Sequence, residues 1–562
     1  MLNARRNLDQ PITTASADMT LFNYGAVTYS KTGLSFGYLA SYLGQEEFDR
    51  AMMAYFEKWK YKHPQPNDLK AVLEAETGKN LDWFFDEMLA TTQKVDYKLN
   101  GVKAPKQDGG DWKIEVKNKG QLAGPIAVSA ITEKDTVTQW VTGFEGKQSL
   151  LFPDADYTLF KIDSDRRIPE YRRRNNTMRA HGLLKKVEPF KLQFFGSAEN
   201  PNKTQLFWSP AIAWNNHDKT MLGIGLYNNV VPEQNFQFVL VPMYSFGGEN
   251  IVGTGQVAYN MYPTWAQKVA LRVHGKRFHG FRNSTFEQLY DRVVPELEVN
   301  LKRPEPRSPI NQSIRLRGIY LHTDAERNTD NLTLSSNTED YFYEFRYQFS
   351  NERTLNPFGV VLNAQGHEDF QNASIEATYR WSYLPNKKNG GLDIRLFAGK
   401  FFENRPSGVL AMWRTSGQDN LFDYTYEHLF FDRGQTSSLL SRQFAETHGA
   451  LKAPLPGGAN NTMVALNLKA DLPAITVLPI GVFADAVATS DFGGGFADSI
   501  LFDAGVHIPV VKGIFEVYFP LVYSSDISDY FENQDISFGE RIRFTLHLER
   551  LNPFKFAEQF EL

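Results

Sequence analysis

The residues near the start of the chain that could take part in chemistry are two tyrosines and a lysine, Tyr24, Tyr29 and Lys31. A phenol is neutral at pH 7 and donates a hydrogen bond, so it can stabilise negative charge that develops on a reacting oxygen. The plain alternative is that Tyr29 is a buried tyrosine at the start of a helix. Lys31 is interpreted as a structural residue rather than a catalytic one.

Histidine spacing decides whether the sequence can hold a peptidase-type zinc site. Such a site needs His-Glu-x-x-His on a helix, because two histidines four residues apart face one way and leave the glutamate as general base. None of the 11 histidines has a partner at that spacing. His274 and His279 are five apart, and His367 and Glu368 are followed by Gln371 where the second histidine would stand. The sequence therefore contains no zinc site of this type.

Several short motifs follow one another near the N-terminus, at residues 23–33, 42–44, 47–56, 67–69 and 81–85. In their order and spacing they resemble the M1 aminopeptidase family of gluzincins over residues 20–92. The resemblance continues loosely through the following strands to residues 162–163 and 175–176. In that family a tyrosine in a Tyr-x-Lys-Gly setting hydrogen-bonds the oxyanion that forms when zinc-bound water attacks the peptide carbonyl.

Carried over by this resemblance, Tyr29 is the oxyanion stabiliser and Tyr24 flanks the same cleft. Thr32 departs from the family pattern, which usually has glycine directly after the lysine. Because the zinc ligands are missing, the resemblance implies no cofactor in this chain, and zinc only with an upstream half that carries the ligands. The chain alone is expected to be inactive as a peptidase.

The elements around these residues are expected to be helical over residues 1–94. In residues 46–60 the large apolar side chains fall at helical spacing on one face. Further helices are expected over residues 68–76, capped by Asn67 and closed by Gly78, and over residues 81–91. These segments predict a helical lobe, the C-terminal part of an M1 peptidase-like domain.

Residues 95–165 change to short strands, expected at residues 97–102, 112–116, 126–132, 138–141 and 157–162. Short strands separated by Gly-rich and Lys-rich turns predict a small β-sandwich. Residues 166–188, which include three consecutive arginines, are expected to be a polar linker.

Residues 189–562 contain repeated apolar and polar alternation, for example Tyr343, Phe345 and Tyr347 against Glu344 and Arg346. The alternating segments are ~9–11 residues long, the length that a tilted strand needs to cross a bilayer. A large soluble sandwich also alternates, but its strands average ~5–6 residues. We therefore predict a transmembrane antiparallel β-barrel, closed because open edges in hydrocarbon leave polar groups unpaired. About 16 strands are expected, with 14 or 18 as alternatives.

The polar rows of this barrel carry charges of both signs. Mixed signs favour paired networks that fill or narrow a lumen over a selectivity ring of one sign, so a wide selective porin is disfavoured. The residues expected in the lumen are Arg315, Arg317, Arg346, Arg380, Arg541, Arg543, Glu296, Glu298, Glu344, Glu376 and Glu549.

Composition restricts location and partners. The formal net charge is −5, which predicts no nucleic-acid partner, and the chain has no cysteine for a disulfide or thiolate site. No run of eighteen apolar residues occurs, so any crossing of a membrane must use strands. We expect a Gram-negative outer membrane, whose lipid is then a partner. The N-terminus lacks the apolar core of a secretory signal, so Met1 is interpreted as a truncation or an internal start.

Two functions remain open from the sequence. In the first, the chain is the C-terminal portion of an outer-membrane-anchored M1-type zinc metallopeptidase that acts on peptides, with its zinc-binding half upstream. In the second, the peptidase-like lobe is a dead scaffold and the barrel works alone, as a porin, a secretion pore or an assembly factor.

Overall fold

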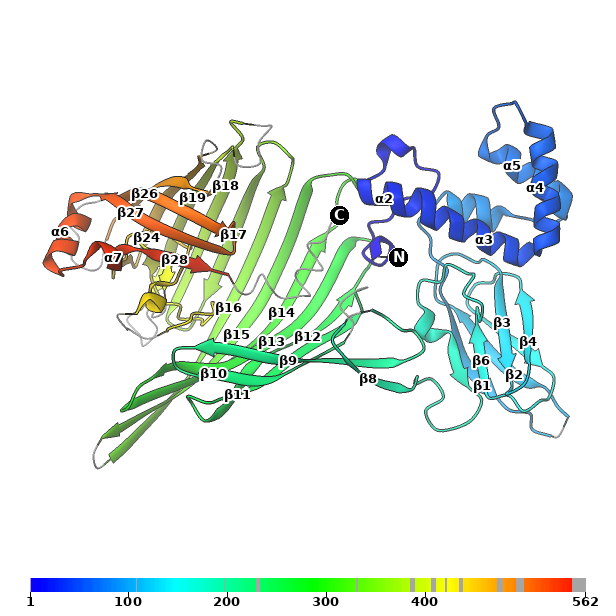
Figure 1. The fold of residues 1–562 in the computed structure, drawn as a ribbon, viewed down its shortest axis with the longest axis horizontal. Coiled ribbons are helices and arrows are strands. Elements are labelled where there is room, and N and C mark those ends of the chain that lie inside the picture. The colour runs from blue at the N-terminus through cyan, green and yellow to red at the C-terminus, as the bar shows by residue number, and fades with distance from the viewer. Residues whose placement is uncertain are drawn as a thin grey trace.

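The computed structural model describes residues 2–547 except for 108, 197, 229–232, 330–331, 385–389, 406–410, 420–421, 434–437, 473–478 and 492–499. Figure 1 shows two parts, a lobe of helices and short strands and a large sheet of long strands, with β8 between them. Among the described residues, no helix has both the length and the apolar character needed to cross a bilayer.

The N-terminal residues form the helices that the apolar spacing predicts. A capping box between Gln65 and Asp68 starts α5 two residues earlier than predicted with Asn67 as the cap, and Gly78 ends the helix with φ 62°. The helical segments are α1 (Leu2–Arg5), η1 (Ser16–Asp18), α2 (Leu21–Gly25), η2 (Ala26–Lys31), α3 (Thr32–Leu43), α4 (Gln45–Trp59), α5 (Pro66–Thr77) and η3 (Trp83–Leu89).

The next strands form two facing sheets. One sheet has the order β1-β2-β5 and the other β4-β3-β6-β7. Part of the segment expected as a linker belongs to this unit, because η4 lies in it and β7 pairs with β6. The predicted set also lacked β5. The bounds are β1 (Tyr97–Lys103), β2 (Trp112–Asn118), β3 (Ile126–Ile131), β4 (Thr136–Val141), β5 (Lys147–Phe152), β6 (Leu159–Ile162), η4 (Arg173–Asn175) and β7 (Thr177–Arg179).

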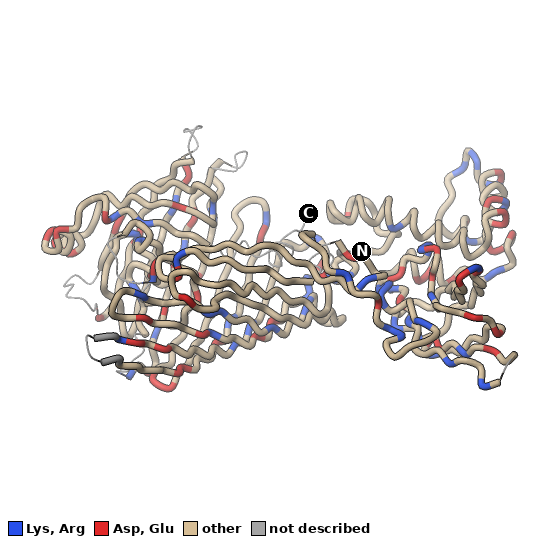
Figure 2. The backbone as a smooth tube through the Cα atoms, turned by 60° about the horizontal axis from the view of Figure 1, so that its bottom comes forward, with Lys and Arg blue, Asp and Glu red and all other residues tan. Residues whose placement is uncertain are grey.

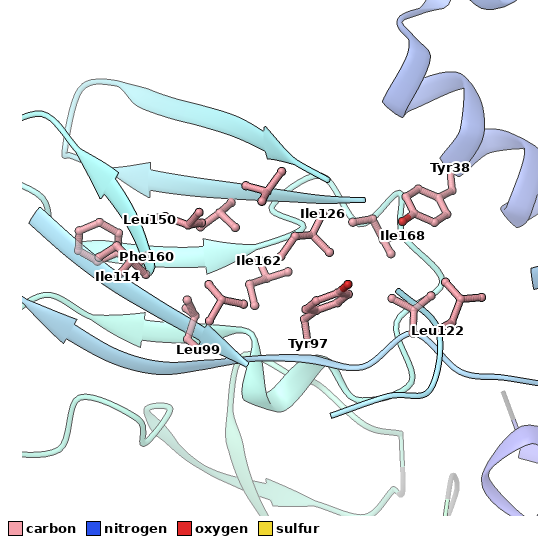
Figure 3. Close-up of a cluster of buried hydrophobic side chains, with 14 of the residues drawn as sticks. Tyr38, Tyr97, Leu99, Ile114, Leu122, Ile126, Leu150, Phe160, Ile162 and Ile168 are labelled. Carbon is pink, nitrogen blue, oxygen red and sulfur yellow. The ribbon is translucent and has the colours of Figure 1, made fainter. Parts of the chain in front are cut away.

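Helices and sandwich share one hydrophobic core. Tyr38 of α3 is fully buried, and its hydroxyl donates to the carbonyl of Pro125 at the start of β3. Figure 3 shows Tyr38 reaching from its helix toward the cluster around Tyr97, whose hydroxyl donates to Gly124 at 3.0 Å. Apolar side chains of the helices and of the sandwich are therefore buried in the same cluster.

Among the described residues, seventeen strands form the large sheet, in the order β8 to β19 followed by β24 to β28. The expected count was about sixteen and the expected pairing wholly antiparallel. The strand count and the pairing differ from these expectations because of the five-residue strand β8. It adds one strand to the sheet, and it pairs parallel to β9. The first strands are β8 (Phe190–Phe194), β9 (Thr204–Asn215), β10 (Lys219–Tyr227), β11 (Phe236–Ser245), β12 (Asn250–Met261), β13 (Ala266–Arg282) and β14 (Phe286–Leu301).

The remaining strands of the sheet are also long. They are β15 (Ile310–Thr329), β16 (Leu332–Asn351), β17 (Phe358–Gly366), β18 (Phe370–Trp381), β19 (Leu392–Asn404), β24 (Thr462–Asp471), β25 (Gly481–Thr489), β26 (Ile500–Val511), β27 (Phe515–Tyr523) and β28 (Arg543–Leu546).

The register gives the sheet one apolar and one polar face. Leu271, Leu297, Leu316 and Phe345 lie opposite one another on four successive strands. The adjacent positions form a charged row, in which Arg272 lies 3.0 Å from Glu296 and Arg317 lies 2.8 Å from Glu344. Figure 2 shows charges of both signs along the strands.

The connection between β19 and β24 carries four two-residue strands and one short helix. These are β20 (Trp413–Arg414), β21 (Gln418–Asp419), η5 (Leu439–Arg442), β22 (Phe444–Ala445) and β23 (Gly458–Ala459). Two helices that the alternation did not predict, α6 (Ser525–Asn533) and α7 (Phe538–Arg541), join β27 to β28. Arg541, expected in the lumen, is in α7 and donates to the carbonyl of Ile536. Glu549 lies outside the described residues.

Polar contacts join the lobe to one end of the sheet. Glu199, in the connection after β8, lies 3.1 Å from Arg5 and 3.1 Å from Arg174. The Asn7 side chain donates to the carbonyls of Tyr262 and Pro263 in the β12–β13 connection, both at 3.3 Å. The N-terminal segment therefore lies against the end of the large sheet that is nearest the lobe.

Candidate functional site

Tyr24 and Tyr29 meet on one face of the first long helix. Residues five apart in a regular α-helix point in different directions, but Ala26–Lys31 forms a π-helical turn, in which positions five apart align. The two rings pack edge to face with centroids 6.0 Å apart and an interplanar angle of 85°. The local widening of the helix therefore brings together the two residues that the sequence singled out.

A buried asparagine fixes the start of this helix. Asn23 is fully buried, accepts from the Asn3 side chain at 2.9 Å and donates to the carbonyl of Leu8 at 2.8 Å and to Gln10 at 3.0 Å. The Thr20 hydroxyl caps the helix by accepting from the Asn23 amide at 3.2 Å. The sequence reasoning missed Asn23. The one feature of the sequence that could have indicated Asn23 is its place three residues after Thr20, a residue type that caps helices.

Lys31 and Thr32 have structural contacts. The Lys31 ammonium lies 3.6 Å from the Asp9 carboxylate and 3.5 Å from the carbonyl of Gln10. Thr32 replaces the glycine of the family pattern without ending the helix, since its hydroxyl donates to the carbonyl of Val27 at 3.0 Å. The departure from the pattern therefore leaves the wide turn intact.

Both tyrosines are open to solvent. Tyr29 is 65% exposed and Tyr24 41% exposed, so the alternative of a buried helix-start tyrosine does not hold. Hydrogen bonding to Tyr24, followed by its charge, raises the pKa of Tyr29 above its ordinary value of 10.0. Near neutral pH the Tyr29 hydroxyl is therefore protonated, which is the form that can donate to an oxyanion.

The described residues of the lobe include no ligand set for the zinc of this peptidase class. Among the described residues, one group of His, Cys, Asp and Glu side chains could hold a metal ion, namely His367, Glu368 and Asp369. It lies in the β17–β18 turn, and the ring of His367 stacks on Phe342 and Phe370 at 4.8 and 5.4 Å. Three consecutive residues in a turn do not reproduce two histidines on one helix face, so they do not fit that zinc site.

The comparisons with known proteins include matches to the segment that contains both tyrosines. Residues 1–88 match the model of the peptidase family M1 domain. Aminopeptidase M1-D of Oryza sativa subsp. japonica is 35% identical over 88 residues, which are 15% of this chain and 9% of that protein. Aminopeptidase M1-B of the same plant is 34% identical over 92 residues, 16% of this chain and 10% of that protein. The chain thus spans about a tenth of the length of these relatives.

Solved structures match over more than half of the chain. BamA from Haemophilus ducreyi lacking POTRA domains 1-3 gives a TM-score of 0.34 at 8% identity, covering 59% of this chain and 71% of that one. CdiB from Acinetobacter baumannii gives 0.30 at 9% identity, covering 58% and 61%. Residues 1–88 thus match the model of a peptidase family M1 domain, and the same chain continues into a sheet with seventeen described strands.

Proposed function

We propose that this chain is the C-terminal portion of an outer-membrane-anchored M1-type zinc metallopeptidase with aminopeptidase-like activity. The observation that carries the proposal is the paired, exposed Tyr24 and Tyr29 inside the segment that matches the M1 domain model. The zinc ligands would come from an upstream portion, because the sequence in hand has no His-Glu-x-x-His.

Tyr29 has a defined role in this proposal. Its hydroxyl donates a hydrogen bond to the oxygen that becomes negatively charged when the peptide carbonyl turns tetrahedral. Tyr24 borders the same face, and its hydrogen bond raises the pKa of the neighbouring Tyr29 phenol. Exposure of both rings leaves room for a substrate and for the residues of an upstream portion that would close the cleft.

The large sheet is proposed as the membrane anchor in the outer membrane of a Gram-negative bacterium. A closed barrel satisfies every backbone polar group within hydrocarbon, and the apolar row of Leu271, Leu297, Leu316 and Phe345 would face lipid. Barrels of this kind have their longer connections on the extracellular side. The connections at residues 405–461 and 524–542 lie at the end away from the lobe, which supports a lobe in the periplasm.

A second candidate is a non-enzymatic barrel with a dead peptidase scaffold, which would serve as a porin, a secretion pore or an assembly factor. The observation in its favour is the missing zinc motif in the sequence. The two candidates differ in what lies upstream of Met1 in the gene.

One comparison tests the proposal. The 562-residue chain and a chain extended upstream to include His-Glu-x-x-His are purified and assayed for bound zinc and for cleavage of aminoacyl substrates. We expect stoichiometric zinc and cleavage only in the longer chain. A gene without such an upstream sequence, or a longer chain that binds zinc and cleaves nothing, supports the dead scaffold instead.

A further inference from the structure

The connection between β19 and β24 is hydrogen-bonded to strands all around the sheet. We name its described residues, 411–419, 422–433 and 438–461, the lumen segment. Many of its residues are buried, including Thr415, Ser416, Asp432, Leu451 and Lys452, each at 0% exposure. Because four of these five side chains are polar or charged, their burial requires partners. The partners are on the polar face of the strands.

On one side of the barrel the lumen segment is held through Glu427. Its carboxylate lies 2.9 Å from the Arg317 guanidinium of β15 and pairs with Arg292 of β14. Arg292 also donates to the carbonyl of Thr425 at 2.8 Å, and Lys276 of β13 donates to the carbonyl of Glu427 at 2.9 Å. One stretch of three residues therefore carries bonds to three neighbouring strands.

On another side the segment is held by strands far away in the strand order. The Lys452 ammonium lies 3.1 Å from Asp485 of β25, and the Ala453 amide donates to Asp503 of β26 at 2.6 Å. Glu446 lies 3.0 Å from Lys469 of β24, and Arg543 of β28 donates to the carbonyl of Ser416 at 2.9 Å. Seven steps of strand order separate β14 from β25 in a ring of seventeen.

A segment bonded to nearly opposite sides of a ring must cross its interior. A cavity of about 650 Å³ remains at the mouth near the lobe, lined by Arg6, Lys268, Glu298 and Arg303 among others, and none of its lining residues belongs to the lumen segment. The segment therefore occupies the half of the lumen that is away from the lobe. The space that remains opens toward the periplasmic side of the proposed function.

We propose that the lumen segment closes the barrel to ions and small solutes, and that Glu427 is the residue that holds it against β13, β14 and β15. The chain is then an anchor with a closed lumen at rest, and breaking the Glu427 contacts opens it. This inference rests on the membrane location in the proposed function and not on the peptidase assignment. A chain without peptidase activity can therefore still confirm it.

Ion conductance of the full 562-residue chain in planar lipid bilayers tests the proposal. We expect the native chain to be almost silent and Glu427→Gln to raise the open probability by roughly tenfold or more, because Arg292 and Arg317 lose the charge that they share. Glu298→Gln is the matched control, since Glu298 on β14 pairs with Arg272 on β13 and not with the lumen segment. Heat-modifiable migration verifies that each variant has folded.

An engineered disulfide gives a second measurement. The Asn216 side chain, in the β9–β10 turn, donates to Asp432 of the lumen segment at 3.1 Å. The chain has no cysteine, so Asn216→Cys with Asp432→Cys forms a unique pair. In the Glu427→Gln background, oxidation should suppress the openings and dithiothreitol should restore them.

Three results would overturn the proposal: steady conductance of the native chain, a folded Glu427→Gln chain as silent as the native one, or equal openings in Glu298→Gln. If Glu427→Gln does not fold, the cysteine pair in the otherwise native chain decides the matter. Failure of that pair to cross-link would then place the segment elsewhere.

Discussion

Leu297 on β14 lies directly opposite Leu316 on β15, while the next residue, Glu298, lies opposite Arg315. One step along the strand therefore changes the environment from the apolar to the charged face. Since side chains alternate with a period of two, substitutions at these neighbouring positions test which face meets lipid.

Leu297→Arg should prevent or strongly reduce insertion of the folded barrel. An arginine on the lipid face near the bilayer midplane costs ~2–4 kcal/mol, whereas Glu298→Arg places its charge on the polar face and should be milder. The measurement is the yield of heat-modifiable protein in outer-membrane fractions for both variants. Equal losses would mean that the two faces are assigned wrongly.

Residues 190–547 should migrate as a compact species on gels until boiled, and the whole chain should fractionate with the outer membrane. The reason is that a closed sheet has no free edge at which a detergent can start to unfold it. Gel mobility before and after boiling measures this. Recovery of the whole chain as a detergent-free soluble monomer would contradict the membrane assignment.

Tyr29→Phe should lower the turnover number of an upstream-extended chain by ~10² to 10³ with much less effect on substrate binding, because an oxyanion donor acts mainly in the transition state. Tyr24→Phe is the matched control on the same face, and it should be closer to the native enzyme. Steady-state kinetics separates the two parameters. An unchanged turnover number in Tyr29→Phe would show that another residue stabilises the oxyanion.

The lobe should become less stable as the pH rises, because of Glu170. Burial, followed by the charge of Asp96, raises the pKa of Glu170 well above its ordinary value. The folded lobe then binds a proton that the unfolded chain releases, so the free energy of unfolding falls as the pH increases from the unfolded pKa toward the folded one.

Glu170→Gln removes this dependence while keeping a group that can accept from the Tyr97 amide, which lies 3.4 Å from the carboxylate. The variant should therefore raise the melting temperature of the lobe more at pH 8 than at pH 5, by ~2–4 °C for each 1 kcal/mol gained. Calorimetry of the full chain at both pH values measures this. A smaller gain at pH 8 than at pH 5 would reverse the assigned sign.

The faces of the long strands could be predicted because apolar alternation reports directly which side is in a nonpolar environment. The parallel pairing of β8 could not, since five residues of alternation contain no information on direction. Helices α6 and α7 were missed because their apolar residues were interpreted as continuing the barrel. β7 was missed because its charged neighbours favoured a linker.

For the candidate site, residue types and spacing were sufficient to select Tyr24 and Tyr29 but not to place them together. That placement depends on the π-helical turn at Ala26–Lys31, which no local propensity distinguishes from an ordinary helix. Asn23 and Glu427 were missed for a related reason. Each acquires its partners from segments distant in sequence, and only the fold brings those partners near.

The two ion pairs of Glu199, with Arg5 and Arg174, restrict how the lobe can move relative to the large sheet. They join the base of the barrel to the N-terminal segment and to η4 of the packed lobe at once, which restricts swivelling as well as separation. The face that carries Tyr24 and Tyr29 would then keep a fixed distance from the end of the sheet, so any partner of this face must approach it at that distance.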